Sequence, residues 1–183
     1  VDEYYLMDKA AEKVSIGANR LLYLPYLMGE RTPHLDPNAR GMFFGLSAIH
    51  TRKEMLRAVM EGVAYSLRDC MEICREMGIE VSDMMACGGG GSSSLWRQML
   101  ADLYACPVKT VTSKEGPALG VAILALVGAK VYDSVETACK EIIKSDKVQS
   151  PINENIPEYE KFYQLYKEIY PAVKDKCAKL AEL

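Results

Sequence analysis

A run of four glycines, Gly88–Gly91, most constrains how this chain can fold. The run follows the apolar segment 83–87 and precedes Ser92-Ser93-Ser94, a pattern that predicts a buried parallel strand, a turn and the start of a helix. Glycines let a ligand approach the backbone closely, and the free N–H groups at a helix start favour anions or polar atoms. The pattern therefore predicts an α/β fold with a ligand beyond the carboxyl end of a strand. A glycine-rich turn without a ligand is the alternative.

The rest of the chain supports the α/β class through its alternation of apolar and periodic segments. Strands are predicted over 21–24, 42–44, 83–87 and 107–111, and helices over 2–13, 51–78, 92–105, 116–129, 134–144 and from Pro157 to near the end, with a kink at Pro171. This order predicts a layered α/β domain with a largely parallel sheet. The apolar run 117–129 predicts a buried helix and is too short to cross a bilayer.

The clearest helix signal begins at Thr51, with Glu54 three residues later as the partner in a capping box. Gly78 marks its end. The apolar side chains recur at steps of three and four and predict one core-facing stripe: Leu56, Met60, Val63, Leu67, Cys70, Cys74 and Met77. The charged residues are expected on the other faces: Arg57, Glu61, Arg68, Glu72 and Arg75.

Two further motifs are candidates for a site. Residues 115–120, from Glu115 to Gly120, form a second strand-to-helix junction that would share a crevice with the first if the two strands are neighbours, although Gly120 is better explained by close packing. The loop 29–41 carries the donors Arg31, His34 and Arg40. It could bind phosphate or sugar hydroxyls, or be made rigid by an Arg–Glu clamp.

Composition excludes several classes of protein. The 183 residues are 49% hydrophobic with a net charge of −3, which fits a folded domain and argues against a nucleic-acid partner. The sequence contains no Walker A motif, no G-x-G-x-x-G and no G-x-S-x-G. The six cysteines include no C-x-x-C pair and are expected to be small buried residues in a reducing, cytoplasmic setting. Neither a metal site nor a membrane partner is indicated.

Several segments resemble the FGGY carbohydrate kinase family, and within it the xylulose kinases. The matching segments are Leu24–His34, Asp36–Leu46 with Glu54–Ala64, Gly88–Gly90 with Trp96–Asp102, and Gly116–Ala122. The resemblance implies an actin-like ATPase fold, also called ribonuclease H-like, in which residues 1–183 form the C-terminal, nucleotide-side domain. It further implies that the opening phosphate hairpin and the N-terminal domain, which holds the sugar and the catalytic aspartate, precede Val1.

By the same resemblance, the whole enzyme would use ATP and Mg²⁺ to phosphorylate D-xylulose to xylulose 5-phosphate. The nucleotide-binding residues carried over are Gly88, Gly89, Gly90, Ser92 and Ser93. No catalytic residue falls in this chain, so the chain alone is expected to be inactive. Glycerol and gluconate are alternative substrates, and a non-catalytic actin-like nucleotide-binding module is the alternative function. A homodimer is possible, and the loop 29–41 is expected to brace the interdomain hinge.

Overall fold

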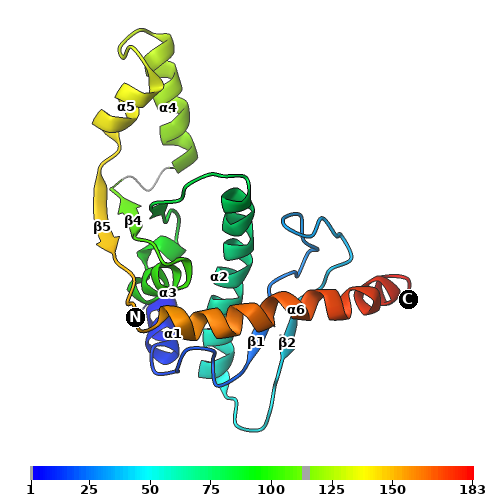
Figure 1. Ribbon diagram of the computed structural model, residues 1–183. Helices are drawn as coiled ribbons and strands as arrows, with labels where there is room; N and C mark the ends of the chain where they lie inside the picture. The colour runs from blue at the N-terminus through cyan, green and yellow to red at the C-terminus, as the bar shows by residue number, and fades with distance from the viewer. Residues whose placement is uncertain (1, 113–115) are drawn as a thin grey trace.

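The computed structural model describes residues 2–112 and 116–183 (Figure 1). The elements in chain order are α1 (Glu3–Ala11), β1 (Leu22–Leu24), β2 (Met42–Phe44), α2 (Arg52–Glu76), β3 (Met84–Met85), the 3-10 turn η1 (Gly90–Ser92), α3 (Ser94–Tyr104), β4 (Val108–Val111), α4 (Gly116–Gly128), α5 (Val135–Ile142), β5 (Ser145–Gln149) and α6 (Ile156–Ala181). Figure 1 shows two parts. The body contains α1–α3, β1, β2 and α6, and the arm, formed by α4 and α5, projects beyond β4 and β5.

The strands form two small sheets. In one, β1 pairs antiparallel with β2, with Leu22 opposite Phe44. In the other, β3 runs parallel to β4, and β4 pairs antiparallel with β5. The α/β class is therefore confirmed, but the largely parallel sheet is wrong, because among the strands β1–β5 of the described residues only β3 and β4 pair in parallel. Nothing in the sequence predicted β5, whose residues Ser145–Gln149 are polar except Val148 and mostly exposed, and so lack the apolar signature of a strand.

The long helix α2 confirms its predicted ends. Thr51 and Glu54 form the capping box, in which the Thr51 N–H donates to Glu54 Oε2 at 2.8 Å. Gly78 follows the helix with a φ of +80°, the left-handed conformation that commonly ends helices.

The predicted core face of α2 is wrong. Arg57 and Glu61, expected outside, are buried, whereas Leu67 and Met77 of the apolar stripe are exposed. Arg57 Nε donates to Glu61 Oε1 at 2.6 Å, and Glu61 also accepts the Gly17 N–H at 3.2 and 3.1 Å. This face can be buried because each charged group has a partner.

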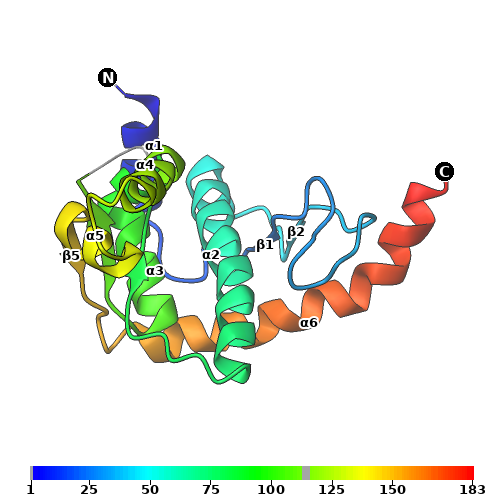
Figure 2. The same cartoon turned by 90° about the horizontal axis from the view of Figure 1, so that it is seen from above.

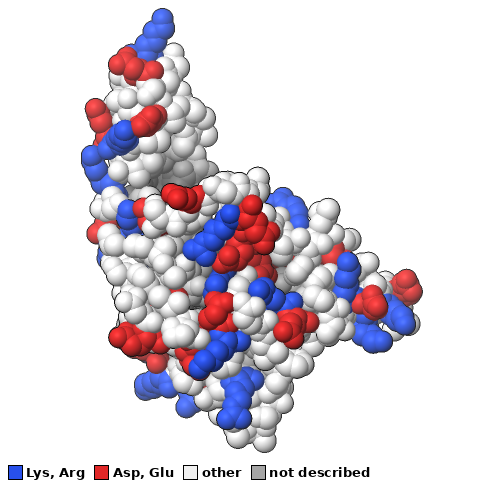
Figure 3. Space-filling model, in the orientation of Figure 1, with Lys and Arg blue, Asp and Glu red and all other residues white. Residues whose placement is uncertain are grey.

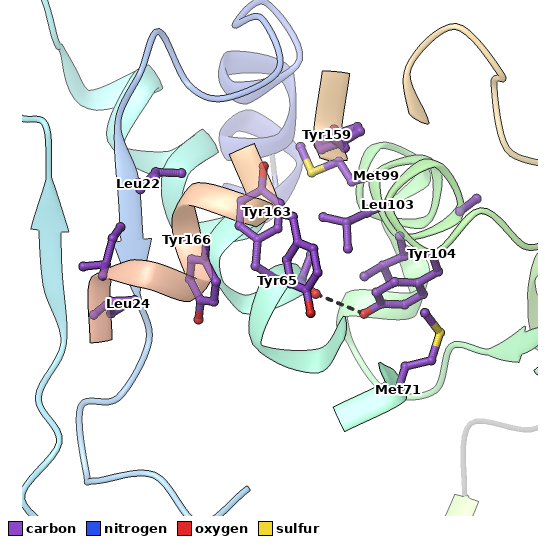
Figure 4. Close-up of a cluster of buried hydrophobic side chains, with 14 of the residues drawn as sticks. Leu22, Leu24, Tyr65, Met71, Met99, Leu103, Tyr104, Tyr159, Tyr163 and Tyr166 are labelled. Carbon is purple, nitrogen blue, oxygen red and sulfur yellow. Dashed lines mark hydrogen bonds between the residues drawn. The ribbon is translucent and has the colours of Figure 1, made fainter. Parts of the chain in front are cut away.

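Tyrosines make up much of the core of the body (Figure 4). Tyr159, Tyr163 and Tyr166 point inward from α6, at the three- and four-residue spacing of one helical face. They meet Tyr65 of α2, whose ring centroid lies 5.2 Å from that of Tyr166. Tyr104 of α3 adds a fifth ring and donates to the Ala64 carbonyl. The last helix therefore holds α2, α3 and β1 together.

The arm differs from its sequence prediction. Although α4 carries no charged residue, only Ile123 is buried along its length, and Val121 and Leu124 are 67% and 61% exposed. Figure 3 shows the uncharged side of the arm above the body. The expected buried helix is therefore wrong, because the described residues place little against α4 except α5.

The last helix contains Pro171, as predicted, and Figure 2 shows α6 bending in its second half. This agrees with the loss of one backbone donor at proline. None of the helices in the described part of the chain has the length and apolar content needed to cross a membrane.

Candidate functional site

The glycine run lies where the sequence predicted, between the end of β3 and the start of α3. Gly88 has a φ of +77°, a conformation that glycine adopts without strain and that turns the chain after the strand. The following residues close into η1 through successive bonds, with the Gly91 N–H donating to Gly88 O at 3.2 Å and the Ser92 N–H to Gly89 O at 3.1 Å. The sequence thus places a tight, glycine-lined turn at the carboxyl end of a parallel strand.

The two halves of the run have different surroundings. A side chain on Gly90 would collide with the Trp96 ring, and one on Gly91 would lie 2.9 Å from the Ala86 carbonyl oxygen. At Gly88 and Gly89, by contrast, a Cβ would meet open space. The N–H groups of these two residues have no backbone acceptor within residues 2–112 and 116–183. The first half of the run is therefore the part that a ligand can reach.

The two serines also differ. Ser93 is the N-cap of α3, and its Oγ accepts the Trp96 N–H at 3.0 Å. Ser92 is exposed, and its Oγ donates to Gly89 O at 2.6 Å. Ser92 therefore keeps its acceptor capacity for a ligand outside the loop, whereas Ser93 is used to begin the helix.

The strands that lead into the two junctions are neighbours. Met84 of β3 is opposite Val108 of β4 in a parallel pairing, so the carboxyl ends of the two strands lie at the same edge of the sheet. Of this motif, α4 begins at Gly116, and Glu115 lies outside the described residues. Close packing does not explain Gly120, because within the described residues a Cβ there would meet open space.

An apolar cavity of about 430 Å³ adjoins the glycine run. Its walls come from the second half of α2, from β3 and from α3, and include Leu67, Cys70, Cys74, Met84, Cys87 and Trp96. Part of the predicted α2 stripe therefore lines this cavity instead of the core. All six cysteines are free thiols; Cys106 is buried and Cys87 is exposed.

The loop 29–41 does not gather its donors into a site. Arg31 is exposed, Arg40 Nη1 donates to the carbonyls of Pro37 and Ala39 at 2.8 Å each, and His34 turns inward against Tyr26. In the part of the chain that is described, neither arginine forms the expected Arg–Glu clamp.

Aromatic and carboxylate contacts hold this loop instead. The Tyr170 hydroxyl donates to Asp36 Oδ2, and the Tyr170 ring stacks on His34 at 4.1 Å between centroids. Tyr26 Oη lies 3.1 Å from His34 Nε2 and 3.0 Å from Tyr166 Oη. Burial is the main cause that lowers the pKa of His34, whereas the Tyr170 hydrogen bond lowers that of Asp36.

Carboxylates near the glycine run already have partners. Asp83, before β3, pairs with Lys109 at 2.9 Å. Asp102, buried in α3, accepts from Gln98, from the Ile152 N–H and from Asn155 at 2.6 to 2.8 Å. Among the described residues, no three His, Cys, Asp or Glu side chains form a group suited to a metal ion.

The family resemblance included the segment Trp96–Asp102, but sequence reasoning gave no role to two of its residues that shape this site. Trp96 packs under Gly90, and the buried Arg97 donates to the Gly91 carbonyl at 2.6 Å. Helical spacing from the Ser93 cap could have indicated that both lie in the turns next to the glycines. It gave no sign that the arginine is buried.

Comparison with known proteins identifies what this arrangement is similar to. Residues 2–129 match the C-terminal domain model of the FGGY family of carbohydrate kinases. A xylulose kinase of Staphylococcus epidermidis is 43% identical over 170 residues, which cover 93% of this chain and 34% of that protein. A gluconokinase of Bacillus licheniformis is 36% identical over 182 residues, covering 99% of this chain and 35% of the relative.

The structure of a ligand-bound xylulose kinase from Lactobacillus acidophilus superposes with a TM-score of 0.88 and 30% identity, covering 95% of this chain and 35% of that one. The expected actin-like ATPase fold is thereby confirmed. This chain spans about a third of the length of the curated relatives it matches.

Proposed function

This chain belongs to the FGGY family of carbohydrate kinases, whose C-terminal domain it matches, and we propose that it forms the nucleotide-side domain of an ATP-dependent sugar kinase. The observation that carries the proposal is the open half of the glycine run, Gly88 and Gly89, at the start of α3. Their N–H groups and the exposed Ser92 hydroxyl suit the polar atoms of a nucleotide. Gly90 and Ser93 belong to the same site by shaping the loop.

The chain's own part in phosphoryl transfer is to bind and orient the nucleotide. Such transfer depends on positioning, on Mg²⁺ to neutralise phosphate charge, and on a base that takes the proton of the sugar hydroxyl. The carboxylates Asp83 and Asp102 already have protein partners, so the described residues near the loop provide no ligand set for Mg²⁺. We place the base and the metal ligands in the remainder of the enzyme, together with the sugar site.

D-xylulose is the substrate we propose, with gluconate as the second candidate. Xylulose kinases of several bacteria are 35–44% identical to this chain, which supports the first. The gluconokinase of Bacillus licheniformis supports the second, because its match covers 99% of this chain. A panel of D-xylulose, gluconate and glycerol, assayed with the full-length enzyme and ATP, distinguishes them by kcat/KM.

The remaining proposals concern the setting of the enzyme. We propose that a sugar-binding domain faces the glycine run across a cleft and that the enzyme works in the cytoplasm. A homodimer is the assembly we propose, and sedimentation of the full-length enzyme tests it. A chain of residues 1–183 alone is expected to show no sugar-dependent ATP consumption, because it lacks the base.

Nucleotide binding at the glycine run is tested with Gly89→Asp in the full-length enzyme. Gly89 has helical backbone angles and open space beside it, so aspartate fits the fold but places bulk and negative charge where the nucleotide would bind. We expect ATP affinity to fall at least tenfold, measured by calorimetry. Gly128→Asp, the same change at an exposed glycine of α4, is the control. Equal ATP affinity in both variants would refute this site.

A further inference from the structure

Arg97 is a buried cation that the proposed function leaves unexplained. Only 4% of the residue is exposed, and within residues 2–112 and 116–183 no carboxylate lies within 4 Å of its guanidinium. Its Nε has no hydrogen-bond partner there. Burying an arginine without a carboxylate costs stability, and an apolar residue of similar volume is often as stable or more stable at such a position. Fold stability alone therefore gives little reason for an arginine.

The contact that Arg97 does make is with the glycine run. Its Nη1 donates to the Gly91 carbonyl oxygen at 2.6 Å, a short charge-assisted bond. Gly91 is itself buried, and its backbone passes so close to the Ala86 carbonyl that a Cβ would lie 2.9 Å from that oxygen. The guanidinium thus holds the loop against the end of β3 at the point where the chain turns toward α3.

The neighbouring residue strengthens this anchoring. Trp96 packs beneath Gly90, and the backbone N–H of Trp96 donates to Ser93 Oγ at 3.0 Å. Two consecutive residues of α3 therefore fix the second half of the glycine run, Gly90 and Gly91. The first half, Gly88 and Gly89, has open space beside its backbone and is joined directly to this fixed second half.

We propose that Arg97 is a positioning residue for the nucleotide, acting through the Gly91 carbonyl to hold the glycine run in its binding conformation. This inference rests on the proposed function, because it assumes that the nucleotide binds at Gly88 and Gly89. A loop that is fixed before binding loses less conformational entropy when the ligand arrives. Arg97 therefore contributes to ATP affinity without touching the nucleotide or the sugar.

The test is Arg97→Met in the full-length enzyme, with ATP affinity measured by calorimetry and the KM values for ATP and sugar measured separately. We expect ATP affinity to fall about tenfold, the size of one hydrogen bond to a charged group, with the sugar KM unchanged and the melting temperature within a few degrees of wild type. Arg75→Met is the matched control, because Arg75 also donates to a backbone carbonyl, that of Tyr104 at 3.0 Å, away from the glycine run.

The outcomes separate this inference from the proposed function. If the wild-type enzyme does not bind ATP, the proposed function fails. If the wild type binds ATP and a folded Arg97→Met variant binds it equally well, or loses affinity for ATP and sugar alike, the positioning role is overturned. Arg97→Lys keeps the charge and a donor, and it decides the question if the methionine variant does not fold. If Arg97→Lys loses part of the ATP affinity and keeps the sugar affinity of the wild type, the positioning role is supported. If its ATP affinity equals that of the wild type, the positioning role is overturned.

Discussion

The body and the arm of this molecule use apolar residues in opposite ways. In the body, rings such as Tyr65 and Tyr166 are nearly inaccessible and pack against one another. In the arm, α4 is the most uniformly apolar helix of the described chain, yet it leaves Val121 and Leu124 largely in solvent. Composition alone would have predicted a buried α4 and exposed α2 and α6, since α2 and α6 carry many charges and α4 carries none.

The difference shows that burial follows partners and not residue type. The charged pair of α2 is buried because its atoms meet each other, a backbone N–H and a tyrosine hydroxyl. The apolar helix α4 stays exposed because, in the described residues, only α5 packs closely against it. We therefore expect the body to unfold cooperatively and the arm to open locally at lower free energy.

The largest expected effect comes from Arg57→Met in the body. This change leaves Glu61 buried without its partner at 2.6 Å and removes the donor to Tyr159 Oη at 2.8 Å. We expect a loss of about 4 kcal/mol in the free energy of unfolding, measured by urea denaturation at pH 8. Lys140→Met is the control in the arm, where the pair with Glu136 is largely exposed, and a change within about 0.5 kcal/mol is expected.

The cost of Arg57→Met should also depend on pH. Burial raises the pKa of Glu61 to about 7, against the opposing attraction of Arg57. A carboxyl whose folded pKa lies above its unfolded value binds more protons when folded, so its contribution to stability falls as pH rises from about 4.5 through 7. Removing Arg57 raises the pKa of Glu61 further, because the attraction of Arg57 lowers it. The loss of unfolding free energy caused by Arg57→Met should therefore be smaller at pH 5, where Glu61 is protonated, than at pH 8. An equal loss at both would show that Glu61 keeps one protonation state.

A pair of leucines tests the comparison directly. Leu103 of α3 lies in the core beside the tyrosines, and Leu124 of α4 is 61% exposed. We expect Leu103→Ala to lower the free energy of unfolding by about 3 kcal/mol, through lost burial and a new cavity. Leu124→Ala should change it by less than about 0.5 kcal/mol. If the two losses are similar in this chain, α4 is packed in solution and the contrast between body and arm is broken.

The sequence predicted the elements well because their signals are local. The capping box at Thr51, the serine cap before α3 and the break at Gly78 depend only on nearby residues, and each is found. The glycine run was likewise found in its predicted place, because a strand, a turn and a helix cap follow one another along the chain. Which half of the run is open could not be predicted, since Trp96 and Ala86 decide it through packing.

What failed were predictions that depend on long-range contacts. The buried face of α2 depends on two distant contacts: Gly17 lies 44 residues from its partner Glu61, and Tyr159 lies 102 residues from its partner Arg57. The periodicity of the helix itself cannot predict such contacts. The polar strand β5 exists because it pairs with β4, not because its side chains favour burial. The FGGY motifs identified the family, but the buried Arg97 became visible only in three dimensions.

Two tyrosines of the core separate packing from hydrogen bonding. The hydroxyls of Tyr65 and Tyr166 are both buried, but Tyr166 Oη lies 3.0 Å from Tyr26 Oη, whereas Tyr65 Oη has no partner in the described part of the chain. We expect Tyr166→Phe to cost about 1 kcal/mol of unfolding free energy and Tyr65→Phe to be neutral or slightly stabilising. A larger loss for Tyr65→Phe would mean that its hydroxyl has a partner, such as a buried water.

The smallest effect we predict is a pH dependence located where the loop 29–41 meets the body. Burial lowers the pKa of His34, which Lys174 also lowers and which Asp69, Glu30 and Asp36 oppose. As pH falls below about 6.5, the unfolded chain therefore takes up the proton before the folded one, and stability decreases. Between pH 7 and 5.5 the melting temperature of the wild type should fall relative to that of His34→Gln, since glutamine does not titrate and Glu61 is present in both proteins. Identical slopes would show that the pKa of His34 is the same in the folded and unfolded chain, in spite of its contacts with Tyr26 and Tyr170.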